Sequence, residues 1–68
     1  MRERGVVSRW DSARNFGFIR RDCDDEAEDL FVHISGLQGR WEPAAGDHVE
    51  FEICDTERGL RGIRVRRL

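Results

Sequence analysis

The chain contains two short segments that decide its fold, Asn15-Phe16-Gly17-Phe18-Ile19-Arg20 and, after an acidic stretch, Leu30-Phe31-Val32-His33-Ile34. Each segment is rich in β-branched or aromatic residues and alternates with a period of two, a pattern typical of a β-strand. Because successive side chains of a strand point to opposite faces, the alternation also predicts which residues lie together.

The two predicted strands each have an aliphatic face and a second face that carries rings. The aliphatic residues, Ile34 among them, make the better core face and are expected to point inward. The rings of Phe16, Phe18, Phe31 and His33 then stand together on the outside. A soluble monomer rarely exposes so many aromatic side chains without a use for them. Their simplest use is to stack on other flat rings, and nucleobases are the obvious ligands.

The same residues resemble a known family. Phe16-Gly17-Phe18-Ile19 resembles the first ribonucleoprotein motif of bacterial cold-shock domains, and Phe31-Val32-His33-Ile34 resembles the second. Residues 5–11 are placed like the first strand of that family, and residues 58–65 like its last. The resemblance therefore covers nearly the whole chain and implies nucleic-acid binding.

The remaining segments predict an all-β fold. Strands are expected over residues 5–10, 49–54 and 60–67, with a short helical turn over residues 35–38. Phe51 alternates with polar residues in one of these strands and is expected in the core. Five short strands with turn signals between them predict a small closed barrel. The resemblance makes this a five-stranded antiparallel OB-fold barrel, with residues 1–68 as a single cold-shock domain.

The charge distribution favours a nucleic-acid partner even though the formal net charge is −2. Six of the fourteen acidic residues lie between Asp22 and Asp29, which leaves twelve arginines against eight acids in the rest of the chain. Arginine suits phosphate contacts and stacking on bases. The acidic stretch is expected to be a solvated loop; the alternative of a calcium loop fails at Ala27 and His33, where glycine and glutamate are needed.

No disulfide, structural metal or cofactor is expected in this chain. Cys23 and Cys54 allow one disulfide at most and lack zinc-site spacing, so two free thiols are the default. No apolar run is long enough to span a bilayer, and no signal peptide is evident, so a cytoplasmic protein without a membrane partner is expected. No constellation of nucleophile and base is present, and the protein is predicted not to be an enzyme.

Four residues outside the two motifs are further candidates for nucleic-acid binding: Trp10, Arg9, Trp41 and Arg61. Trp10 is expected on the face of the first strand opposite Val7, beside the phenylalanines. Two interpretations of Arg9 stay open, a base or phosphate contact and an ordinary solvated arginine. Trp41 either reaches the binding face or closes the end of the barrel. Arg61 is expected on a phosphate-binding rim.

His33 is open to several interpretations as a lone histidine. A stacking and phosphate-contacting role is preferred over an inert surface position, and catalysis is the least favoured because no serine or cysteine is paired with it. In the turn before the first motif, Asn15 takes a place where the family often has glycine. Asparagine tolerates the left-handed conformation that such a position requires.

The exposed rings predict binding of single-stranded RNA and DNA. A preference for pyrimidine-rich strands, and a role as an RNA chaperone or cold-shock-type regulator of transcription or translation, are implied by the resemblance. The alternative is an N-terminal accessory module of a longer, membrane-linked protein, and a third interpretation is a translation-factor-like domain that reads ribosomal RNA by shape. Both a monomer and a domain-swapped dimer are compatible with the sequence.

Overall fold

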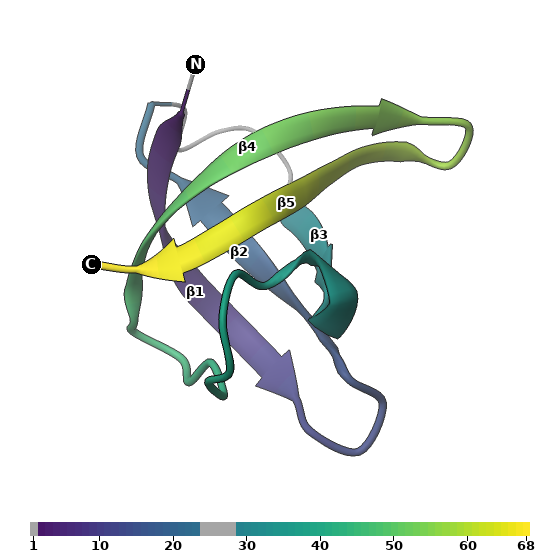
Figure 1. Cartoon of the computed structure of the whole chain (residues 1–68). Helices are drawn as coiled ribbons and strands as arrows, with labels where there is room; N and C mark the ends of the chain where they lie inside the picture. The colour runs from purple at the N-terminus through teal and green to yellow at the C-terminus, as the bar shows by residue number, and fades with distance from the viewer. Residues whose placement is uncertain (1, 24–28) are drawn as a thin grey trace.

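The computed structural model describes residues 2–23 and 29–68. These residues form five strands and one short 3-10 helix, and the strands close into a barrel in the order β1-β2-β3-β5-β4 (Figure 1). The predicted all-β barrel is confirmed. The elements are β1 (Glu3–Asp11), β2 (Phe16–Arg21), β3 (Leu30–His33), η1 (Ile34–Gly36), β4 (His48–Thr56) and β5 (Gly59–Arg67).

The predicted five-stranded antiparallel barrel is confirmed, with one strand pairing that is parallel. Four neighbouring pairs run antiparallel, but β3 and β5 pair in parallel through Phe31 and Arg61. The reason is topological, because direction cannot alternate all the way round a ring with an odd number of strands. The parallel contact brings the C-terminal strand beside the second motif.

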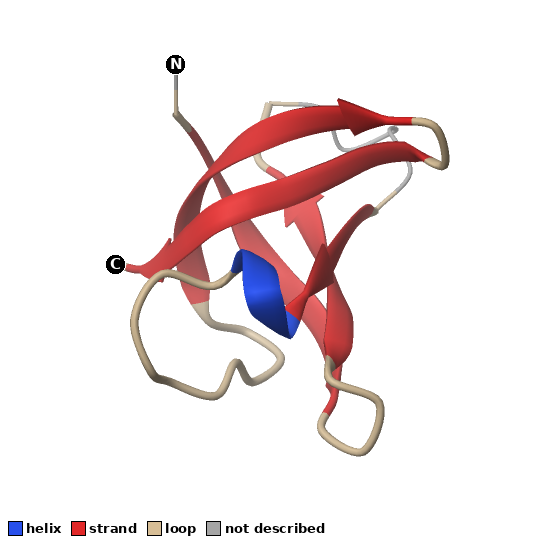
Figure 2. Cartoon of the chain, turned by 45° about the vertical axis from the view of Figure 1, so that its right-hand side comes forward, coloured by secondary structure: helices blue, strands red, loops and turns tan. Residues whose placement is uncertain are grey.

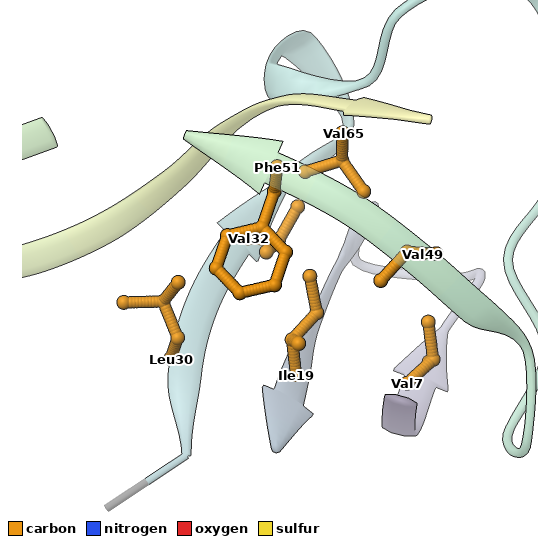
Figure 3. Packing of buried hydrophobic residues seen from close by; sticks show 7 residues of the cluster. All are labelled: Val7, Ile19, Leu30, Val32, Val49, Phe51 and Val65. Carbon is orange, nitrogen blue, oxygen red and sulfur yellow. The ribbon is translucent and has the colours of Figure 1, made fainter. Parts of the chain in front are cut away.

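The interior of the barrel is filled by the aliphatic faces of the strands together with Phe51 (Figure 3). Phe51 has no exposed surface, which confirms its predicted place in the core. Burial of each such side chain contributes roughly 1.5–3 kcal/mol. The core consists of Val7, Ile19, Leu30, Val32, Val49, Phe51 and Val65.

Ile34 does not belong to the core, and its predicted inward position is wrong. Its backbone amide donates to the carbonyl of Asn15 at 2.8 Å, and the chain turns there into η1 (Figure 2). The side chain is 45% exposed as a result. The alternation of the second motif therefore ends at His33.

Two residues other than glycine have positive φ angles. Asn15 has φ 60°, which confirms the left-handed conformation predicted for it. Arg64 has φ 51° and lies where the pairing of β4 with β5 shifts register, between Glu50 and Glu52. No sequence pattern indicated this second position.

Glu50 is a buried carboxylate, 8% exposed, that joins three segments of the chain. Arg2 Nε donates to Glu50 Oε1 at 2.6 Å, and Arg66 Nε donates to the same oxygen at 3.0 Å. Arg2 also donates to the carbonyl oxygen of Arg64 at 2.8 Å. Burial alone would raise the pKa of Glu50, but the hydrogen bond from Arg2 and the charge of Arg66 outweigh it and hold the pKa below its ordinary value.

Replacing this carboxylate is expected to change how stability depends on pH. A carboxyl group with a lowered pKa in the folded state stabilises the protein above its unfolded pKa, and this contribution is lost as the pH falls through the folded value. Glu50→Gln is therefore expected to lower the urea midpoint at neutral pH, and the difference from the parent is expected to be smaller at about pH 3, below the ordinary glutamate pKa. Glu57→Gln, at an exposed turn residue, serves as the control. A difference that is the same at both pH values would contradict the prediction.

Candidate functional site

Three phenylalanine rings form an aromatic cluster on the outer face of β2 and β3. Phe18 lies directly across from Phe31 in the strand pairing, and the two ring centroids are 5.9 Å apart. Phe16 is 5.5 Å from Phe31 and 6.1 Å from Phe18. All three side chains are half-buried. The two motifs are thus brought together as the alternation predicted, and the aromatic cluster consists of Phe16, Phe18 and Phe31.

Two arginines lie over rings of the aromatic cluster. The guanidinium carbon of Arg9 is 4.9 Å from the centroid of Phe18, and that of Arg61 is 5.0 Å from the centroid of Phe31. Both distances are within the range of a cation–π interaction. The structure therefore places Arg9 and Arg61 at the aromatic cluster, one from β1 and the other from β5.

Trp10 lies beside Phe16 and Phe18, as predicted, but the strand face predicted for it is wrong. The register of β1 against β2 shifts between Val7 and Arg9, so that Arg9 pairs with Phe18 and Trp10 pairs with Gly17. Such a β-bulge reverses the alternation beyond it. Trp10 is consequently half-buried and packs against the core.

Gly17 makes room for the indole ring that the bulge turns inward. A Cβ atom at Gly17 would lie 2.6 Å from Cε3 of Trp10 and 2.4 Å from the carbonyl oxygen of Arg9. Trp10 still borders a shallow pocket of about 360 Å³ that Phe16 and Phe18 also line. The indole is therefore next to the aromatic cluster without being part of its outer face.

His33 lies at the end of β3 and forms hydrogen bonds with Ser35 of the 3-10 helix η1. Its ring Nδ1 accepts from the backbone amide of Ser35 at 3.1 Å and lies 2.9 Å from the hydroxyl oxygen of Ser35. His33 thereby caps η1, while the ring stays exposed. It is the strand partner of Phe16, so the exposed ring borders the aromatic cluster.

The contacts of Trp41 are those of a residue that closes the end of the barrel. The ring is half-buried and packs against the core. Its Nε1 donates to the carbonyl of Gln38 at 3.0 Å, and the guanidinium of Arg67 lies 5.9 Å from the ring centroid. Of the two interpretations of Trp41, these contacts favour the structural one.

Ser8 and Asp29 also lie at the edge of the aromatic cluster, and sequence reasoning did not single them out. Ser8 Oγ donates to Asp29 Oδ2 at 2.7 Å and is 3.2 Å from the carbonyl oxygen of Phe18. Together with Arg9 and Phe18 they line an open pocket of about 490 Å³. In the sequence Asp29 is only the last residue of an acidic stretch, so its position could be found only from the fold.

A second groove continues from Phe31 towards the turn between β4 and β5. Arg58 and Leu60 line a pocket of about 280 Å³ with Phe31 and Arg61. Leu60 is 46% exposed. This groove adds cationic and apolar surface to the side of the aromatic cluster opposite Arg9.

Residues 2–23 and 29–68 contain no group of three or more side chains that could hold a metal ion. The calcium-loop alternative falls mainly on residues 24–28, which lie outside the described residues. Cys23 and Cys54 are both free thiols. No described helix has the length and apolar character needed to cross a membrane.

The chain is similar to known proteins along nearly its whole length. A profile of the family described as the 'Cold-shock' DNA-binding domain matches residues 3–68. The chain is 38% identical over 64 residues to cold shock-like protein CspC of Escherichia coli, which covers 91% of this chain and 90% of that protein. It is 36% identical over 66 residues to the major cold shock protein of Micrococcus luteus, which covers 94% of this chain and 96% of that protein.

Similar domains also occur within longer chains. Cold shock domain-containing protein C2 of Mus musculus is 35% identical over 51 residues, a match that spans 75% of this chain but 32% of that protein. The solved structure of drosophila Unr CSD456 superposes with a TM-score of 0.79 at 29% identity, over 100% of this chain and 27% of that chain. The chain thus spans less than two thirds of both of these relatives.

Proposed function

The chain belongs to the cold-shock domain family of nucleic-acid-binding proteins, and from this premise we propose that it binds single-stranded RNA and DNA by stacking bases on its aromatic cluster. The observation that carries the proposal is the set of half-buried rings of Phe16, Phe18 and Phe31, held 5.5 to 6.1 Å apart on the outer face of two paired strands. A rigid sheet holds the rings apart, so that successive bases of one strand have separate stacking surfaces.

The expected affinity follows from the number of rings. Each base stacked on an aromatic side chain contributes roughly 1–3 kcal/mol, so three rings contribute roughly 3–9 kcal/mol before the cost of association. Contacts between arginines and phosphates add to this sum. Binding at micromolar concentrations is expected, with loose sequence preference because every base has a π-face. Duplexes hide those faces and are expected to bind poorly.

An RNA-chaperone role is the biological function that this kind of binding supports best. Stacking in a DNA duplex contributes roughly 1.4 kcal/mol per base-pair step, which is comparable to one base stacked on a phenylalanine. The domain can therefore compete with base pairing and still release the strand. The alternative of an accessory module in a longer protein is supported by relatives that hold a similar domain within a longer chain, since the match spans 32% of the mouse protein and 27% of the drosophila chain.

A tryptophan fluorescence titration tests the proposal. Trp10 borders the pocket lined by Phe16 and Phe18, so its emission is expected to be quenched by single-stranded oligothymidine but not by a duplex. A Trp41→Phe variant leaves Trp10 as the only reporter. The logarithm of the affinity is expected to fall with the logarithm of the salt concentration, with a slope of about −0.7 per phosphate engaged. Absence of quenching and of binding at low salt would refute the proposal.

A further inference from the structure

The pocket lined by Ser8, Arg9, Phe18 and Asp29 combines three kinds of surface in about 490 Å³. Phe18 supplies a ring face, Arg9 supplies a fork of N–H donors, and Asp29 supplies a carboxylate that only accepts. The β-bulge creates the combination, because it turns Arg9 rather than Trp10 to the side of Phe18. Ser8 and Arg9 of the pocket come from β1 and Phe18 comes from β2. These two strands are neighbours in the barrel (Figure 1).

Each polar group has a partner of its own, and a base that stacks on Phe18 would move the Arg9 guanidinium from the face of the ring to the edge of the base. The guanidinium of Arg9 lies over Phe18 at 4.9 Å, and Asp29 Oδ2 accepts from Ser8 Oγ at 2.7 Å. Within residues 2–23 and 29–68, no ion pair of 4.0 Å or less joins Arg9 to Asp29. As far as residues 2–23 and 29–68 are concerned, the ion pairs and hydrogen bonds leave the donors of the arginine and the second oxygen of the carboxylate available to a ligand.

The donor and acceptor pattern of the pocket matches one base better than the others. Guanine presents two acceptors, O6 and N7, to an arginine fork, and two donors, N1–H and the N2 amino group, to a carboxylate. Uracil and thymine have a single N–H between two carbonyl oxygens, which a carboxylate repels. Adenine and cytosine each offer one amino group and no second donor beside it.

We propose that Arg9, Phe18 and Asp29 form a guanine-selective subsite for one base of a bound single strand. The inference rests on the proposed function, because it assigns a preference to a position on the same binding face. The proposed preference for guanine differs from the pyrimidine-rich preference that the family resemblance implies. The reason is that the guanidinium of Arg9 and the carboxylate of Asp29 bind the edges of the base, where the bases differ.

Oligonucleotides that differ at one position test the subsite. The reference is oligouridine, and the others carry a single guanine, adenine or cytosine at a central position. The guanine oligomer is expected to bind about tenfold more tightly than oligouridine, within the range for one good bidentate contact. Inosine, which lacks the N2 amino group, and 7-deazaguanine, which lacks N7, are each expected to lose most of that gain.

Two variants separate the polar contacts from general electrostatics. Asp29→Asn and Arg9→Gln are each expected to reduce the ratio of guanine to uridine affinity about tenfold. Asp29→Asn is expected to increase the affinity for oligouridine, because it removes a negative charge that repels both the phosphates and the uracil carbonyl oxygens. Arg14→Gln is the matched control; this exposed arginine does not line the pocket, so its loss is expected to weaken all oligomers equally.

The outcomes distinguish this inference from the proposed function. Equal affinity for the guanine oligomer and oligouridine would overturn the subsite and leave single-strand binding intact. Unchanged discrimination in both Asp29→Asn and Arg9→Gln would overturn the assignment of these residues. Absence of binding to any single strand would overturn both proposals.

Discussion

Replacement of Phe31 by alanine is expected to weaken the binding of single-stranded oligonucleotides about tenfold or more. Phe31 is at the centre of the aromatic cluster, because its ring contacts both Phe16 and Phe18 and lies under the guanidinium of Arg61. The substitution removes one stacking surface and also the neighbour that orients the other rings. Phe18→Ala is expected to have a similar effect. Titration with oligothymidine, monitored by fluorescence anisotropy of a labelled oligomer, measures the loss.

The variants at the aromatic cluster are expected to remain folded, because their rings are half-exposed and point away from the core. Circular dichroism and the midpoint of thermal unfolding check this requirement. Val6→Ala is the matched control, since Val6 is a half-buried β1 residue that pairs with Arg20 and His48, away from the aromatic cluster. Unchanged affinity in a folded Phe31→Ala variant would remove the stacking mechanism.

The second large effect is expected on the free energy of unfolding, when Phe51 is replaced by alanine. Phe51 is fully buried and packs in the centre of the barrel (Figure 3). Phe51→Ala is expected to cost about 3–5 kcal/mol, because it removes the burial of the ring and leaves a cavity. Small domains are stable by only roughly 5–15 kcal/mol, and those of this size are near the lower end. A large fraction of the variant is therefore expected to be unfolded near 37 °C.

Urea denaturation followed by circular dichroism measures this loss. The contrast with Phe18→Ala is informative because the chemical change is the same at both positions. Phe51→Ala is expected to lose stability, whereas Phe18→Ala is expected to lose affinity and retain most of its stability. A Phe51→Ala variant as stable as the parent would mean that the barrel core is not packed around this ring.

The sequence alone determined the strands of the two motifs and the faces of most of their residues. The period-two alternation placed Ile19, Leu30 and Val32 inside and the phenylalanines outside, and Phe51 was correctly assigned to the core. Asn15 was correctly predicted to adopt a left-handed conformation. These features depend on the residue itself and on its immediate neighbours, so they can be inferred without knowledge of the rest of the chain.

The tertiary structure alone decided which residues from outside the two motifs border the aromatic cluster. The bulge in β1 paired Arg9 with Phe18 and Trp10 with Gly17, and the parallel pairing of β3 with β5 brought Arg61 over Phe31. Asp29, which directly precedes β3, is held at the same face by a hydrogen bond from Ser8 of β1. The period-two alternation predicts the face of each side chain only if the strand has no bulge. The position of a bulge and the identity of a strand's neighbour depend on the pairing register of segments that are far apart in the sequence. Non-local pairing therefore sets the charge and the hydrogen-bonding pattern of the site.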